Sequence, residues 1–351
     1  MHQEPERLNA RLRGLLSVSV VAILLLALPL FYWVGARQSY LNQKSATYRA
    51  AFLEDWSARG ILISADDQVL AESVKDPQTG KVKRSYPLGA AAAQTIGYLS
   101  HQYGKSGLEK GCDEWLSSAR GSSAGLLEQL QRLSGLPVPG HKVQVTLNAE
   151  LQKIAYEALG GRRGAVAVIN PQTGAILALA SSPSYDANNV DALFAELRTH
   201  PQAALLNRAT QGLYWPGWAF KIFTAAAALD TGVVTPDTTF DCEGTWQGPG
   251  TRIRCLKRSG HGEISLFDGI RLSCNIALSQ TALKLGLDGF YSYAKAFHLE
   301  DPFELPCASS KGMLPDRLKA TEADLAEMGF GQGRLLVSPL WIALMAGTVT
   351  N

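Results

Sequence analysis

The sequence predicts an α+β protein in three parts: one membrane-spanning helix, a small mixed domain outside the membrane, and a larger domain of helices around an antiparallel sheet. Three observations lead to this fold. A long uncharged run lies near the N-terminus, prolines and glycine interrupt the chain near residue 138, and two apolar segments joined by a turn then predict a β-hairpin. The predicted parts are residues 1–14 in the cytoplasm, 15–35 in the membrane, 36–140 as a first domain and 141–351 as a second.

The membrane anchor is predicted from residues 15–34, LLSVSVVAILLLALPLFYWV, which carry no charged side chain. A helix of about 20 apolar residues crosses a bilayer. Arginines flank the run unequally, which places the N-terminus in the cytoplasm and the bulk of the chain outside. Those before the run are Arg7, Arg11 and Arg13, and Arg37 follows it. A cleaved signal peptide is the alternative, but no small-x-small cleavage site closes the run, so we expect an uncleaved, single-pass anchor.

Composition and charge narrow the classes of partner. Hydrophobic residues make up 46% of the 351 residues, charged residues 18%, and the net charge is +2, which is ordinary for a globular protein. No Lys/Arg block indicates a phosphate-binding surface, so we expect no nucleic-acid partner.

Cys and His show no zinc-type spacing and His261 is interpreted as structural, so we expect no metal and no cofactor. Cys242 and Cys255 lie in one glycine-rich segment and are predicted to form a disulfide.

The first predicted domain has a mixed pattern. A short apolar run occupies residues 61–63, and the stretch 75–84, with Pro77 and Gly80, predicts a hairpin with its turn. Helical spacing is carried by four leucines, Leu126, Leu127, Leu130 and Leu133. The domain boundary is placed at the chain-breaking residues Pro137, Pro139 and Gly140.

The second predicted domain opens with a helix and a hairpin. Asn148 is predicted to cap a helix whose apolar side chains share one face, namely Leu147, Leu151, Ile154, Ala155 and Ala158. Residues 165–169 and 175–180 then form the predicted hairpin around an Asn-Pro-Gln-Thr-Gly turn. Both faces of its strands are apolar, so we expect helices to cover the sheet on both sides. After Tyr185 the pattern is mainly helical, with an irregular loop at 240–262.

One segment of this domain has the residues for chemistry. Residues 205–230, LLNRATQGLYWPGWAFKIFTAAAALD, contain a loop that ends at Pro216-Gly217 and a strong helix-forming run at 219–229. Lys221 falls on the first turn of that helix, where the helix dipole disfavours a cation. Taken alone, this lysine is interpreted as a snorkelling surface residue.

The wider context changes that interpretation, because the segment resembles the active-site helix of penicillin-binding proteins of class B. Their pattern is Asn-Arg-Ala, then Gly-x-Tyr-Pro-Pro-Gly-Ser-x-Phe-Lys. The positions kept here are Asn207-Arg208-Ala209, Gly212, Tyr214, Pro216-Gly217, Phe220 and Lys221. In the family the serine is the nucleophile and the lysine accepts its proton. Here Trp218 occupies the serine position and Trp215 replaces a proline, so the resemblance implies that no acyl-enzyme forms.

A second family motif is intact. Ser273-Cys274-Asn275, within HGEISLFDGIRLSCNIALSQTALKLG, resembles the family's Ser-x-Asn segment. The resemblance implies that Ser273 helps to move a proton to the leaving group and that Asn275 orients the substrate peptide. Another Ser-x-x-Lys, at 292–295, is interpreted as coincidence. The family's third motif, Lys-Thr-Gly, lies beyond the segment seen here at 331–339, so we expect the second domain to be incomplete at its C-terminal end.

The resemblance covers nearly the whole chain. Segments that resemble the family's non-catalytic pedestal are Arg59-Gly60-Ile61, Ile96-Gly97-Tyr98 and Ser106-Gly107-Leu108-Glu109. It implies a cytoplasmic-membrane protein whose domain 36–140 is the pedestal and whose domain 141–351 is transpeptidase-like.

The family activity that the resemblance implies is D,D-transpeptidation, which cross-links peptidoglycan stem peptides at D-Ala–D-Ala through an acyl-serine that β-lactams trap. Retained catalytic positions are Lys221, Ser273 and Asn275, and no cofactor is implied. We expect this chain to be inactive and to react with β-lactams only if a nucleophile is present. Two alternatives stay open: a non-catalytic membrane partner of a SEDS-type glycosyltransferase, or a decayed gene fragment.

Overall fold

The structure is a computed structural model. It describes residues 59–75, 80, 82–100, 102–117 and 140–351, together with Ile23 and Leu25. Three predicted features lie outside the described residues: nearly all of the span 15–35, the leucine-rich helix near residue 130, and the two prolines of the proposed boundary. Within the described part of the chain, no helix has the length and apolar character needed to cross a membrane.

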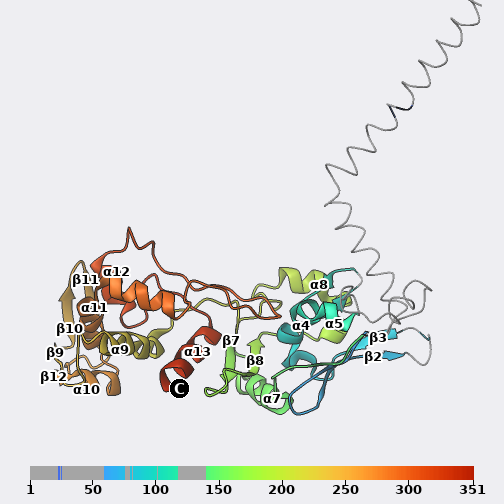
Figure 1. The fold of residues 1–351 in the computed structure, drawn as a ribbon, viewed down its shortest axis with the longest axis horizontal. Helices are drawn as coiled ribbons and strands as arrows, with labels where there is room; N and C mark the ends of the chain where they lie inside the picture. Colours follow the sequence, from blue (N-terminus) through green and yellow to red (C-terminus); the bar gives the residue numbers. More distant parts are fainter. Residues whose placement is uncertain are drawn as a thin grey trace, which may run out of the picture. The chain divides into compact units, whose positions relative to one another are not determined.

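A four-stranded sheet organises the first part of the described chain (Figure 1). Its strand order is β3-β2-β1-β6, with bounds Val82–Ser85, Val69–Lys75, Leu62–Ile63 and Val143–Gln144. The antiparallel pair β2 and β3, with Lys75 opposite Val82, confirms the predicted hairpin. Strand β6 lies parallel to β1, so it brings the chain back to the sheet before the second domain begins.

Short elements pack beside this sheet. They are η2 (Gly89–Ala91), α3 (Ala93–Ile96), β4 (Leu99–Ser100), β5 (Gly104–Lys105), α4 (Gly107–Gly111) and α5 (Asp113–Leu116). A buried ionic network joins them to the strands. The Glu109 carboxylate is fully buried and accepts from Nε of both Arg59 and Arg84 at 2.6 Å. Asp113 accepts from Arg59 at 2.6 Å and from Lys105 at 2.8 Å.

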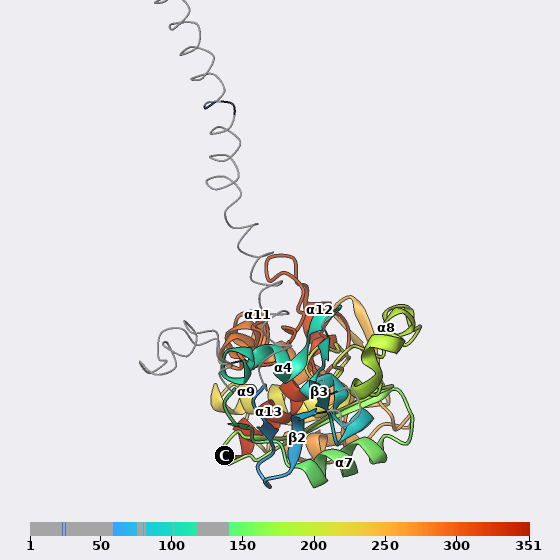
Figure 2. The same ribbon diagram turned by 90° about the vertical axis from the view of Figure 1, so that its right-hand side faces the viewer.

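Helix α7 (Ala149–Ala158) confirms the predicted cap, because Asn148 accepts the Leu151 N–H through its side chain at 2.8 Å. The Asp66 carboxylate, in the turn between β1 and β2, accepts the Ala149 N–H at 2.8 Å. This bond joins the turn between β1 and β2 to α7 (Figure 2). The predicted apolar face is wrong at Ile154, which is 53% exposed, and at Ala158, which is also exposed.

Strands β7 (Gly164–Ile169) and β8 (Ile176–Ser182) form the predicted antiparallel hairpin. Their side chains alternate between two faces. One face packs on α7 through Val166, Val168, Ala178 and Ala180. The other packs with Leu340 and Leu344 of helix α13 (Pro339–Thr350) through Ala165, Ala167, Ile169 and Leu179. Helices therefore cover both faces of the hairpin, as predicted.

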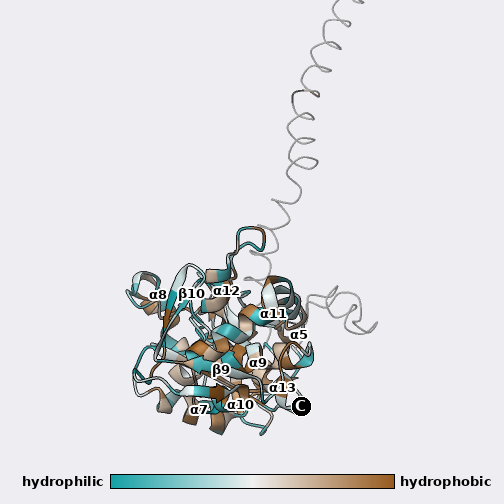
Figure 3. Cartoon of the chain, turned by 90° about the vertical axis from the view of Figure 1, so that its left-hand side faces the viewer, coloured by the Kyte–Doolittle hydropathy of each residue, from teal (hydrophilic) through white to brown (hydrophobic). Residues whose placement is uncertain are grey.

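A helical body completes the fold. Its elements are η3 (Ala187–Asn189), α8 (Val190–Thr199), η4 (Gly217–Ala219), α9 (Phe220–Asp230), α10 (Leu266–Arg271), α11 (Asn275–Ala296) and α12 (Glu322–Met328). Helix α9 confirms the predicted helix and packs Phe220 and Phe223 against Phe290 and Trp341. Figure 3 shows the apolar character of α9 and α13. This aromatic core fixes α9, on which the candidate site is built.

The predicted irregular loop at 240–262 is instead mostly β structure. It contains β9 (Thr239–Cys242), β10 (Thr245–Gly248), β11 (Thr251–Arg254) and the start of β12 (Gly262–Ser265). Strand β10 pairs with β11 and β12 pairs with β9, both antiparallel. Each strand is only four residues long, and glycines separate them, which hid the period-2 pattern in the sequence.

Candidate active site and metal centre

Trp218 lies in the 3₁₀ turn η4 that leads into α9. The turn is held against another chain segment, because the Gly217 N–H donates to the Gly331 carbonyl at 2.9 Å. A Cβ on Gly331 would come within 2.2 Å of the Gly217 oxygen, so only glycine permits this approach of two backbones. The Trp218 indole is 60% exposed, whereas Lys221, one turn later, is 2% exposed.

The three predicted catalytic residues lie together. Lys221 Nζ donates to the Ser273 carbonyl at 2.6 Å, to Ser273 Oγ at 3.0 Å and to Asn275 Oδ1 at 2.7 Å. An ammonium group has three N–H donors, and each therefore has one acceptor here. Helix α9 supplies the lysine, and the junction of α10 with α11 supplies the other two residues.

The environment of Lys221 favours the neutral amine more than water does. Burial lowers the pKa of Lys221 to about 8, against a smaller opposite effect of the Cys274 and Cys255 thiols. A lysine with a pKa near 8 is able to accept a proton from a neighbouring group close to neutral pH. The arrangement therefore places a lysine of lowered pKa beside the Ser273 hydroxyl, 3.0 Å away.

The backbone at Ser273 is strained. Its φ is +55°, in the left-handed region, where a residue other than glycine costs about 1–3 kcal/mol. The turn is held because the Cys274 N–H donates to the Gly269 carbonyl at 2.7 Å. Asn275 Nδ2 donates to the Arg254 carbonyl at 2.9 Å, which ties the motif to β11. These bonds fix the Ser-x-Asn side chains against Lys221.

A cavity of about 500 Å³ lies next to this group of side chains, at Asn275. Trp218 lines it, together with residues 251–254 of β11, Asn275 and a segment around α12 that contributes Glu327, Phe330, Gln332 and Gly333. The cavity lies within the roughly 300–1,000 Å³ typical of small-molecule sites. Sequence reasoning identified Lys221, Ser273 and Asn275 but missed the β11 residues, because their strand was expected to be an irregular loop.

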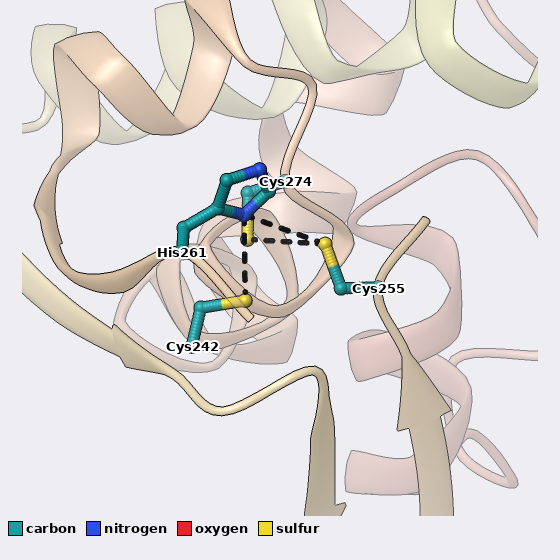
Figure 4. A group of neighbouring side chains, drawn as sticks. All are labelled: Cys242, Cys255, His261 and Cys274. Atoms are coloured by element: carbon teal, nitrogen blue, oxygen red, sulfur yellow. Dashed lines mark hydrogen bonds between the residues drawn. The ribbon is translucent and has the colours of Figure 1, made fainter. Parts of the chain in front are cut away.

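Four further side chains form a candidate metal centre behind the motif (Figure 4). The ligand atoms of Cys242, Cys255, His261 and Cys274 all lie within 4.8 Å of one another. His261 Nδ1 is 3.5 Å from Sγ of Cys242 and of Cys255, and Sγ of Cys255 is 4.0 Å from that of Cys274. Three cysteines and one histidine are a ligand set of structural zinc sites.

Three of the distances between these atoms are close to those in a tetrahedral zinc site. Zn–S bonds of about 2.3 Å at the tetrahedral angle place two sulfurs about 3.8 Å apart, close to the observed separation of Cys255 and Cys274. Cys274 is the middle residue of the Ser-x-Asn motif, so a metal held there would also hold the motif's backbone. Zinc would supply structural cross-linking at such a site, and no open position remains for catalysis.

One expectation, that of a disulfide, is therefore wrong. All five cysteines are free, so Cys242 and Cys255 form no disulfide. A zinc-type set exists although the sequence spacing did not indicate one. The reason is that the four ligands come from separate places: the end of β9, the residue after β11, the residue before β12, and the N-cap of α11. Strand pairing, rather than a short Cys-x-x-Cys knuckle, brings them together.

Two protein families match the chain. Residues 164–351 match the penicillin binding protein transpeptidase domain. Residues 59–143 match the penicillin binding protein A dimerisation domain. The chain belongs to the class B penicillin-binding proteins. The predicted family is thus confirmed, and so is the order of an α+β pedestal domain followed by a transpeptidase domain.

Relatives with curated names agree. The chain is 31% identical over 306 residues to the peptidoglycan D,D-transpeptidase MrdA of Escherichia coli K12, an alignment that covers 74% of this chain and 48% of MrdA. It therefore spans about half the length of that relative. It is 31% identical to the peptidoglycan D,D-transpeptidase PbpA of Mycobacterium tuberculosis H37Rv, over 98% of this chain and 73% of PbpA.

Solved structures show the same likeness. A ceftriaxone acyl-enzyme complex of penicillin-binding protein A from M. tuberculosis has a TM-score of 0.74 at 29% identity and covers 85% of this chain and 70% of that one. The D,D-transpeptidase domain of a peptidoglycan glycosyltransferase from Eggerthella lenta has a TM-score of 0.73 at 30% identity, over 84% and 70%. The class B assignment thus holds for both sequence and fold.

Proposed function

We propose that this chain is a non-catalytic class B penicillin-binding protein at the cytoplasmic membrane. The observation that supports this most directly is Trp218, which occupies the position that the family motif gives to the nucleophilic serine. Family chemistry begins when the serine oxygen bonds to the carbonyl carbon of D-Ala–D-Ala and its proton passes to the lysine. An indole at position 218 has no atom for that bond, although Lys221, Ser273 and Asn275 keep their mutual contacts.

The pedestal domain supports a role as a non-catalytic membrane partner over a decayed gene fragment. Both oxygens of its buried Glu109 carboxylate contact a guanidinium, one that of Arg59 and the other that of Arg84. Loss of either partner of a buried charge pair is strongly destabilising, so an intact pair is what selection for a folded chain maintains. We therefore favour a membrane-anchored partner of a SEDS-type glycosyltransferase over a decayed fragment. Co-purification of the full chain with such a polymerase from membranes is the expected result.

Covalent labelling by a fluorescent penicillin tests the inactivity. The full chain should remain unlabelled after denaturing electrophoresis. PbpA of M. tuberculosis is a suitable positive control, since its solved complexes with ceftriaxone, imipenem and penicillin G are described as acyl-enzymes. A labelled band for this chain, with the label mapped to any residue that lines the cavity beside Trp218, would refute the proposal.

A further inference from the structure

A second cavity, of about 530 Å³, lies between the pedestal and the transpeptidase domain, and we call it the interdomain cavity. Segments of both domains line it, with residues drawn from 94–98, 105–111, 185, 205–211 and 305–308. Its volume lies within the range typical of small-molecule sites. No residue lines both this cavity and the one beside Trp218, so the two are separate sites.

The walls of the interdomain cavity are held against each other. A Cβ on Gly111 of the pedestal would come within 1.6 Å of the Pro306 carbonyl oxygen, so only glycine permits the two backbones to approach this closely. Both residues line the cavity. A second connection is made by Asn207, whose side-chain N–H donates to Oγ1 of Thr95 in the pedestal at 3.3 Å. The cavity is therefore preformed, and a ligand binds it without the cost of ordering its walls.

Two amide side chains of the transpeptidase wall have N–H groups available for a ligand. Asn207 is 4% exposed, and its Oδ1 accepts from the Ser181 hydroxyl and the Ala209 N–H. One of its amide N–H groups donates to Thr95, and the other has no acceptor among the described residues. Gln211 follows one turn later, and its side chain forms no hydrogen bond to a described residue. A buried donor without an acceptor costs free energy, which an acceptor on a ligand would recover.

The charged side chains that line the cavity, among the described residues, are both cationic. They are Lys105 and Lys110 of the pedestal, and no carboxylate lines the cavity beside them. Lys105 Nζ donates to Asp113, which is not a lining residue, at 2.8 Å. Lys110 is exposed and has no ion-pair partner in the described part of the chain. A concave site with cations and without carboxylates attracts an anionic ligand.

Apolar side chains complete the transpeptidase wall, namely Leu205, Leu305, Pro306 and Ala308. The two tyrosine rings of the cavity are nearly covered, because Tyr98 is 8% and Tyr185 5% exposed. These rings leave no open face on which a sugar could stack. The apolar wall suits an aliphatic or aromatic group of the ligand instead.

We propose that the interdomain cavity binds a small organic anion, in which a carboxylate or a phosphate is joined to an apolar group. Lys105 and Lys110 hold the anionic group by charge-assisted hydrogen bonds. Asn207 and Gln211 donate to its oxygens, and the apolar wall covers the rest of the ligand. Such a ligand touches both domains, so it would fix the pedestal against the transpeptidase domain. The inference does not depend on which residue stands at position 218.

Isothermal titration of the full chain in detergent with three ligands tests the inference. 3-Phenylpropionate carries a carboxylate, phenyl phosphate carries a phosphate, and 3-phenylpropionamide is the neutral counterpart. We expect at least one of the two acids to bind at least about tenfold more tightly than the amide, because charge-assisted hydrogen bonds are lost in the amide. The tighter of the two acids identifies the anionic group.

Lys110→Gln should weaken the binding of that acid at least about fivefold and leave the amide unchanged, because it removes the cation that has no ion-pair partner. Gln211→Ala should weaken it by a smaller factor. Lys153→Gln is the matched control, since it removes an exposed lysine of α7 that does not line the cavity. It should leave all affinities unchanged, and thermal melting should show that the variants are folded.

Alkylation of Cys307 locates the bound acid. Cys307 lines the cavity and is half-buried, whereas the other four cysteines are buried. Burial raises the pKa of its thiol to about 11, so its reaction with iodoacetamide is slow enough to follow by mass spectrometry. The tighter acid should slow this alkylation further, and the amide at the same concentration should not.

Equal affinity for the acids and the amide, or no binding of any of them, would overturn the inference. Binding that persists in Lys110→Gln but is lost in the double variant Arg252→Gln, Arg254→Gln would place the acid in the cavity beside Trp218 and overturn it as well. An unchanged alkylation rate of Cys307 at saturating acid would do the same. Penicillin labelling does not bear on the interdomain cavity, so a labelled band would refute only the lack of catalysis.

Discussion

The pedestal core and the cavity beside Trp218 use charge in opposite ways. In the pedestal, Glu109 is fully buried and each of its oxygens meets a guanidinium. In the cavity beside Trp218, the guanidiniums of Arg252 and Arg254 are exposed and have no ion-pair or hydrogen-bond partner among the described residues, and Trp218 is largely exposed beside them. Paired, buried charges fix the arrangement of a domain, whereas unpaired charges on a rigid frame are available for a ligand. The difference separates charges that maintain structure from charges suited to recognition.

We expect the largest change in the free energy of unfolding at the buried ion pairs of Glu109. Glu109→Ala leaves Arg59 and Arg84 buried without their counter-charge, so it should lower the free energy of unfolding by about 3–5 kcal/mol. Urea denaturation followed by circular dichroism measures this. Glu196→Gln, on the exposed face of α8, is the control and should change the value by less than about 0.5 kcal/mol. A loss below 1 kcal/mol for Glu109→Ala would break the contrast between the two regions.

The candidate metal centre should stabilise the segment that carries the Ser-x-Asn motif, because Cys274 is one of its four ligands. We expect the purified chain to contain about one zinc ion per molecule, and bound zinc to add about 4 kcal/mol when its free concentration is a thousand times Kd. Elemental analysis and melting with and without a chelator measure both quantities.

Cys255→Ser should lose the zinc, whereas Cys307→Ser should retain it, because Cys307 lies outside the cluster. If zinc-supplied protein contains no metal and its melting ignores the chelator, the four ligands have only a packing role.

We expect the smallest change in the free energy of unfolding at the surface ion pair of Asp324 and Arg334. The hydrogen bond from Arg334 is the largest cause of the lowered pKa of Asp324, which is about 2 and lies below its usual value near 4. Asp324 also caps α12 with Thr321. Its folded pKa is depressed, so its contribution is present above pH 4 and is lost as the pH falls toward 2.

Asp324→Asn should therefore cost about 1 kcal/mol at pH 7, after discount for the exposure of Arg334, and almost nothing at pH 2. Denaturation at both pH values measures this. Asp288→Asn, in the more exposed pair with Arg317, should be nearly neutral at both. A cost for Asp324→Asn that did not change with pH would assign it to the cap alone.

Local patterns predicted much of the fold. The Asn148 cap, the β7–β8 hairpin and helix α9 each depend on residues close in sequence, and each formed as expected. The contact of Lys221 with Ser273 and Asn275 was predicted only through the family motifs, since more than fifty positions separate the segments. Their catalytic roles stay a prediction.

What the sequence did not indicate depends on the pairing of short strands. The metal cluster requires β9 to pair with β12 and β10 with β11, and four-residue strands between glycines give little periodic signal. The cavity-lining residues Arg252 and Arg254 were missed for the same reason. Ile154 shows the converse error, because a correct helical period does not decide which side chains a neighbouring element covers.

The close backbone contact between Gly217 and Gly331 has a genetic consequence. It keeps the turn at position 218 in place whatever side chain stands there, since the bond that holds it joins backbone atoms. The tryptophan codon TGG differs from the serine codon TCG by one base. A point mutation would thus place a hydroxyl in a frame that already holds Lys221, Ser273 and Asn275 in contact.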